Sequence, residues 1–102
     1  MASRLTEQQF KIVEALIPGE RFGKELRAHL KACGFRKSGP AFYQLMARME
    51  EAGLVRGWYD QKIVDGQIIK QRRYKALGKA MRSFDETRQF FGGAVEGGLS
   101  GA

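Results

Sequence analysis

Apolar residues recur every three or four positions at the start of the chain, which is typical of a helix with one buried face. The residues on this face are Phe10, Val13, Leu16 and Ile17. Thr6, followed three positions later by Gln9, forms a capping box that begins the helix. Pro18 and Gly19 end it. The sequence therefore predicts a first helix between these two signals.

The same spacing predicts two more helices, joined by a short loop. The second covers residues 23–33 and is followed by Gly34, which can adopt the left-handed conformation that ends a helix. Its buried residues are Leu26, Leu30 and Cys33. The third begins at Ser38 or Gly39 and ends at Gly53. Its buried residues are Phe42, Leu45, Met46 and Met49.

From residue 54 onward, the pattern of apolar residues changes from helical to extended. Asp65 and Gly66 lie between two apolar runs, and this dipeptide favours a two-residue type I′ turn between antiparallel strands. The register counted outward from this turn pairs Val64 with Gln67, Ile63 with Ile68, Tyr59 with Arg72 and Trp58 with Arg73. We therefore expect aromatic rings and guanidinium groups to meet across the hairpin in cation–π contacts.

A fourth helix is predicted over residues 76–91, because apolar side chains return to helical spacing there. Its apolar stripe consists of Leu77, Met81, Phe84 and Phe91. Residues 92–102 are rich in glycine and have no apolar pattern, which favours a flexible tail. We therefore predict one folded domain over residues 1–91 and a tail over residues 92–102.

The predicted elements follow one another as three helices, a two-stranded hairpin and a C-terminal helix. A chain of 102 residues has the size of one domain. This order is that of a winged helix-turn-helix domain, an α+β fold that is mainly helical. In such a domain the second and third helices form the DNA-reading pair, and the hairpin is the wing.

Basic residues are concentrated in two stretches of the chain. The formal net charge is +7, and the surplus lies in residues 21–37 and 56–82. These stretches include the second predicted helix and the wing, so their charge favours nucleic acid as the partner. We expect the cations that flank the third helix to bind phosphates, namely Arg36, Lys37, Lys70, Arg72 and Arg73.

The third helix supplies the candidates for contacts with DNA bases. At 100° per residue, Gln44 and Ala47 point away from the core, flanked by Tyr43 and Arg48. Gln44 can form two hydrogen bonds with adenine, and Ala47 can contact the methyl group of thymine. Ser38 and the N-terminus of this helix can bind a phosphate. This face is the predicted major-groove surface.

Residue types that carry out catalysis are sparse. Cys33 is the only cysteine and His29 the only histidine, so a single chain has neither a disulfide nor a Cys/His metal site. With no nucleophile–base pair or paired carboxylates, we expect neither an enzyme nor a cofactor, and no pattern identifies an effector ligand. The chain lacks a long apolar run and a signal-peptide pattern, so we expect a cytoplasmic protein.

Three stretches resemble the PadR-like transcriptional regulators and related winged-helix proteins. Residues 43–55 are similar to the recognition-helix signature of that family, with a tyrosine, apolar pairs, Arg, Glu and a closing Gly-Leu-Val. Residues 22–26 are similar to the start of its second helix, and residues 72–74 resemble the end of its wing. The resemblance implies a regulator that dimerises through its C-terminal helix. Together with the charge pattern, it leads us to expect a repressor that binds double-stranded DNA sequence-specifically.

Two features leave alternatives open. The wing tip is unusually apolar, through Ile63, Val64, Ile68 and Ile69. It can insert near a minor groove, pack against a partner or fold over its own domain, so the alternative function is protein–protein contact without DNA binding. We expect the apolar stripe of the last helix to join two chains in a homodimer, the alternative being that it folds back onto the first helix.

Overall fold

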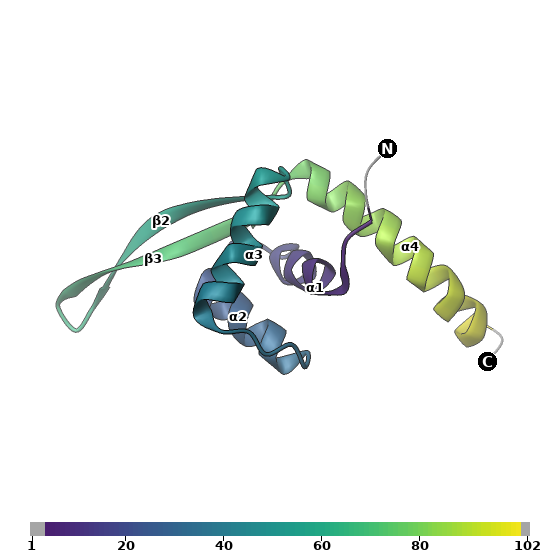
Figure 1. Cartoon of the computed structure of the whole chain (residues 1–102), viewed down its shortest axis with the longest axis horizontal. Coiled ribbons are helices and arrows are strands. Elements are labelled where there is room, and N and C mark those ends of the chain that lie inside the picture. Colours follow the sequence, from purple (N-terminus) through teal and green to yellow (C-terminus); the bar gives the residue numbers. More distant parts are fainter. Residues whose placement is uncertain (1–3, 101–102) are drawn as a thin grey trace.

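The chain forms a helical body with a long hairpin on one side and a long helix on the other (Figure 1). The structure is a computed structural model that describes the backbone of residues 4–100 and the side chains of residues 4–89. In chain order, the elements are α1 (Glu7–Leu16), β1 (Arg21–Phe22), α2 (Gly23–Ala32), α3 (Gly39–Glu51), β2 (Val55–Val64), β3 (Gln67–Ala76) and α4 (Gly78–Ser100). The predicted winged α+β fold, mainly helical, is confirmed.

Local signals begin and end the helices as predicted. The Thr6 hydroxyl accepts a hydrogen bond from the N–H of Gln9, whose side chain accepts one from the N–H of Thr6. Ser38 caps α3 by accepting from the N–H of Ala41 at 3.2 Å. Gly53 follows α3 with φ of 75°, a left-handed conformation that other residues rarely adopt.

The hairpin has the predicted turn and register. Asp65 and Gly66 have φ of 51° and 78°, the two positive values that a type I′ turn requires. The pairs of β2 with β3 include Val64–Gln67, Ile63–Ile68, Tyr59–Arg72 and Trp58–Arg73. A further strand, β1, was not predicted from the sequence; it pairs with β3 and gives the sheet the order β1-β3-β2. This strand has only two residues, which is too short for a periodic pattern.

The core lies where the helices meet the base of the hairpin. Its fully buried side chains include Ile12, Val13, Leu26, Leu30, Phe42, Met46, Met49, Val55 and Tyr74. The prediction for α1 is wrong at Ile17, which was expected on the buried face and is 42% exposed. Ile17 is the C-cap of α1, and at about 100° per residue it lies at the edge of the face that Ile12, Val13 and Leu16 bury.

The last helix folds back onto the first. The Phe84 ring stacks on that of Phe10, with centroids 4.5 Å apart. The buried Thr87 hydroxyl accepts from the N–H of Leu5 at 2.9 Å and donates to the carbonyl of Ser83 at 2.8 Å. Phe84 is therefore a core residue of a single chain and is not available to a partner, contrary to its predicted place in a dimer interface.

The other residues of the predicted dimer stripe differ in their exposure to solvent. Met81 is 37% exposed and Leu77 is half-buried, whereas the side chain of Phe91 lies outside the described residues. The helix begins at Gly78, because β3 runs to Ala76. It also continues to Ser100, past the predicted end at 91, since glycine lowers helix stability without forbidding a helix. The division of the chain into domain and tail stays a prediction.

The stacking of Phe84 on Phe10 should contribute to the stability of the fold. Phe84→Ala should lower the free energy of unfolding by about 3 kcal/mol, because it removes a buried ring and leaves a cavity. Met81→Ala, one turn earlier on the exposed side, should cost less than about 1 kcal/mol. Urea denaturation of the two variants measures both changes, and equal small losses would show that α4 does not pack on α1.

Candidate nucleic-acid interface

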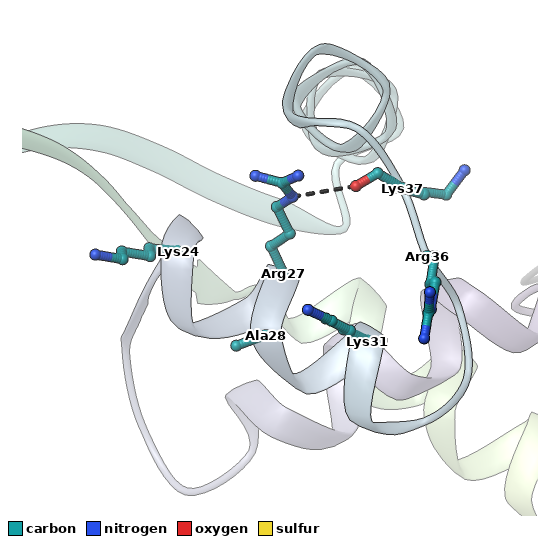
Figure 2. A pocket seen from close by; sticks show the side chains of 6 residues that line it. All are labelled: Lys24, Arg27, Ala28, Lys31, Arg36 and Lys37. Atoms are coloured by element: carbon teal, nitrogen blue, oxygen red, sulfur yellow. Dashed lines mark hydrogen bonds between the residues drawn. The ribbon is translucent and has the colours of Figure 1, made fainter.

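One face of α2 carries cations at helical spacing. Lys24, Arg27 and Lys31 lie along it, and the loop before α3 brings Arg36 and Lys37 beside them (Figure 2). Together with Ala28, these residues line a shallow hollow of about 420 Å³. The Nε of Arg27 donates to the carbonyl of Lys37 at 3.1 Å, so the guanidinium holds the loop against α2.

A second hollow, of about 550 Å³, adjoins the first between the helices and the wing. It shares Lys24 and Arg27 with the first hollow. Its other lining residues are Tyr43, Tyr59, Ile69, Lys70, Gln71 and Arg72. We call the two hollows together the cationic groove. Of the described side chains that line it, none belongs to Asp or Glu.

Most cations of the cationic groove have no acidic partner. Among the described side chains, the ion pairs join Lys11 to Glu14, Arg72 to Glu50, Arg73 to Glu20 and Asp60, and Arg88 to Asp85. The Nε2 of His29 also lies 4.0 Å from a carboxylate oxygen of Glu14. Arg72 is thus the one groove cation in an ion pair within this part of the chain. The others keep an uncompensated positive charge, which attracts polyanions.

The exposed face of α3 lies beside the groove and has the predicted composition. Gln44, Ala47 and Arg48 are exposed, as predicted for residues that face away from the core. Tyr43 is 40% exposed and lines the groove, while its ring meets that of Phe42 edge-on with centroids 5.0 Å apart. This packing gives the Tyr43 ring a fixed position at the border between α3 and the groove.

Arg72 is held inside the groove by neighbours on α3 and the wing. Its Nη2 donates to both carboxylate oxygens of Glu50, at 3.1 and 2.9 Å. Its guanidinium also lies 4.9 Å from the centre of the Tyr59 ring, which confirms the predicted cross-strand contact. Tyr74 and the Glu50 carboxylate raise the pKa of Arg72 above its ordinary value. The charge of Arg72 is therefore largely balanced within the protein.

Arg73 points to the opposite face of the hairpin, because neighbouring residues of a strand alternate. There it pairs with Asp60 at 2.7 Å and with Glu20 at 3.4 Å, and its guanidinium lies over the Phe22 ring. The hydrogen bond from Arg73 lowers the pKa of Asp60 below its ordinary value. Arg73 does not line the groove, so the structure separates it from the other predicted phosphate-binding residues.

The structure brings together about half of the residues predicted from the sequence and adds three from α2. Arg36, Lys37, Tyr43, Lys70 and Arg72 line the cationic groove, and Ser38 caps the adjoining helix. Sequence reasoning did not assign Lys24, Arg27 and Lys31 to the site. Their spacing of three and four residues was the available signal, since it puts all three on one face of a helix.

The apolar wing tip stands away from the body. Ile63 and Ile68 face each other across the hairpin and are 74% and 67% exposed. Of the roles considered for the tip, folding over its own domain is therefore wrong. Contact with DNA or with another protein remains.

Other kinds of site find no support in the part of the chain that the structure describes. No three His, Cys, Asp or Glu side chains within it lie close enough to hold a metal ion. No helix searched there is both long and apolar enough to cross a membrane.

Comparison with solved structures identifies the fold. No protein-family model and no curated protein matches the sequence. A PadR family transcription regulator from Clostridium difficile has 16% identity and a TM-score of 0.69, with 92% of this chain and 98% of that chain covered. A PadR family transcriptional regulator from Eggerthella lenta has 18% identity and a TM-score of 0.67, with 90% and 78% covered.

A third similar structure contains a nucleic acid. It is Bacillus subtilis PadR in complex with operator DNA, at 12% identity and a TM-score of 0.61, with 78% of this chain and 45% of that chain covered. At these identities the likeness establishes a shared three-dimensional arrangement. The chain has the winged-helix fold of the PadR-family transcriptional regulators.

Proposed function

We propose that this protein is a transcriptional regulator that binds double-stranded DNA in the cytoplasm and acts as a repressor. The observation that carries the proposal is the cationic groove, which has no acidic lining and lies beside the exposed face of α3. Duplex DNA fits such a surface, because its phosphates need cations while a helix in the major groove reads bases. The operator complex of the similar Bacillus subtilis protein supports the same partner.

The distribution of ion pairs assigns different tasks to the basic residues. Arg72 and Arg73 already pair with carboxylates, so moving either to a phosphate would leave an acidic group behind. Lys31, Arg36 and Lys37 have no such cost. We therefore assign the main phosphate contacts to α2 and the loop before α3, and a supporting role to the wing. We assign the base contacts to Gln44 and Ala47 on α3. Ser38 and Arg48 contact phosphates of the DNA backbone.

Protein–protein contact is the second candidate function. The exposed isoleucines of the wing tip favour it, because apolar side chains this accessible often contact a partner. Protein–protein contact through the apolar wing tip does not require the uncompensated positive charge of the cationic groove. The two functions therefore differ in their response to salt and to the loss of groove cations.

Removal of two groove cations tests the DNA proposal. The variant Lys31→Ala with Arg36→Ala should weaken binding to duplexes of any sequence. The slope of log affinity against log salt should become shallower by about 1.8, since each lost phosphate contact accounts for about 0.9. Fluorescence anisotropy with a labelled random duplex measures both quantities.

A matched control separates position from net charge. Lys11→Ala with Arg82→Ala removes the same number of positive charges from α1 and α4, outside the groove. This control should keep the slope of the unaltered protein. Equal slopes for both double variants would rule out the groove as the phosphate-binding surface.

Base recognition by α3 gives a second prediction. Gln44→Ala should reduce discrimination at one base pair by about 1–3 kcal/mol, because the two hydrogen bonds to the base are lost. Selection from a random duplex library, followed by affinity measurements on single-base variants of the preferred site, detects the change. Gln89→Ala on the exposed side of α4 is the control, and an unchanged preference in the Gln44 variant would remove Gln44 from base reading.

Dimerisation is a further part of the proposal. Of the apolar stripe on α4, Phe84 is buried in the core and Leu77 is half-buried. Met81 is exposed, so it is the described residue of the stripe that is best placed to contact a second chain. Two copies of the domain would read two half-sites about one turn of DNA apart.

Substitution of Met81 tests the dimer without disturbing the core. Met81→Glu should convert a dimer into a monomer, because it places a charge where two apolar faces would meet. Light scattering at micromolar concentration determines the mass of both proteins. A monomer before substitution, or a dimer that persists after it, would contradict an interface at this point of α4.

A further inference from the structure

The carboxylate of Glu50 joins the end of α3 to both strands of the wing. Its Oε1 accepts from the N–H of Gly57 on β2 at 2.9 Å. Both of its oxygens accept from the Nη2 of Arg72 on β3. Because β2 is an edge strand in the order β1-β3-β2, one side of it has no strand partner within the described residues, and Glu50 supplies an acceptor to this strand. A single side chain thus connects three elements.

Close packing at Gly57 shows that this junction has no spare room. A Cβ at Gly57 would lie 2.7 Å from the Tyr74 ring, 2.8 Å from Oε1 of Glu50 and 2.9 Å from Nη2 of Arg72. Real Cβ atoms do not approach other atoms this closely, so a side chain here would displace the Tyr74 ring, the Glu50 carboxylate or the Arg72 guanidinium and disturb the junction. The hydrogen bonds of Glu50 and the absence of a side chain at Gly57 together fix how near the wing lies to the helix.

The junction determines the shape of the cationic groove. Tyr59 and Lys70 lie on the same face of the hairpin as Arg72, and all three line the hollow between the wing and α2. Glu50 therefore influences where these residues stand relative to α3, although it is not itself among the lining residues.

We propose that Glu50 is a positioning residue that holds the wing against α3, so that this carboxylate strengthens the binding of DNA. The inference rests on the proposed function and concerns how its surface is held together. Electrostatics alone makes the opposite prediction, since a negative charge near the groove repels phosphates and its removal also frees Arg72. Whether removal of the Glu50 carboxylate weakens or strengthens DNA binding therefore distinguishes the two explanations.

Three variants of the full chain test whether loss of the Glu50 carboxylate weakens or strengthens DNA binding. Glu50→Ala should weaken binding to a random duplex about tenfold, the equivalent of one charge-assisted hydrogen bond, in spite of the lost negative charge. Gly57→Ala should weaken it in the same direction without any change in charge. Glu51→Ala is the control, because it removes the neighbouring, exposed carboxylate and should leave affinity equal or higher.

Residual dipolar couplings of backbone amides report the orientation of the wing in the protein without DNA. In the unaltered protein and in Glu51→Ala, the amides of β2, β3 and α3 should fit one alignment tensor. In Glu50→Ala and Gly57→Ala, the wing should require its own tensor or show reduced couplings, while α1, α2 and α3 still share one. The helices that keep a common tensor show that the variants remain folded.

The outcomes separate this inference from the proposed function. Glu50→Ala binding at least as tightly as Glu51→Ala would overturn the positioning role. If the unaltered protein shows no salt-dependent binding to duplexes, the proposed function fails, and the couplings still decide the role of Glu50. A common tensor for wing and helices in Glu50→Ala would overturn that role as well.

Discussion

The register of the hairpin decides which way every side chain of the wing faces. A shift of one residue would exchange the two faces completely, because the side chains of a strand alternate. The turn at Asp65 and Gly66 sets this register. It places Arg72 on the face of the sheet that meets Glu50 of α3, and Arg73 on the other face, with Asp60. The cationic groove, the bridge from Glu50 and the pairing of Arg73 with Asp60 all depend on that assignment.

Features that depend on neighbouring residues were predictable from the sequence. The capping box at Thr6, the cap at Ser38 and the positive φ angles of the turn are local, so short motifs suffice to identify them. The hairpin register follows from the turn by counting. The contact of Arg72 with Tyr59 was predictable for the same reason.

Features that depend on distant residues were not predictable in this way. Stacking of Phe84 on Phe10 joins α4 to α1, which are far apart in the sequence, and no local pattern distinguishes a stripe buried in the core from one that binds another chain. Likewise, Arg72 and Arg73 appeared equivalent as basic wing residues until the fold supplied Glu50 to one and Asp60 to the other. The candidate site therefore lies closer to α2, where Lys24, Arg27 and Lys31 have no such partners among the described side chains.

Charge compensation connects the fold to the proposed function. A protein that binds phosphates gains most from cations that are fixed in place but not already neutralised. Lys24, Lys31 and Arg36 fulfil the second condition, and the hydrogen bond from Arg27 to the loop helps to fulfil the first. The wing forms one wall of the groove, and the hydrogen bond from Gly57 of β2 to Glu50 of α3 connects it to the helices.

An NMR titration of the isotopically labelled protein with a duplex locates the proposed DNA-binding surface on the molecule. Binding in the cationic groove and along the exposed face of α3 should produce the largest changes in amide chemical shift in residues 24–37 and 43–48, with smaller changes in residues 69–72. Changes confined to α1 and α4, or none at a salt concentration that preserves electrostatic binding, would contradict it.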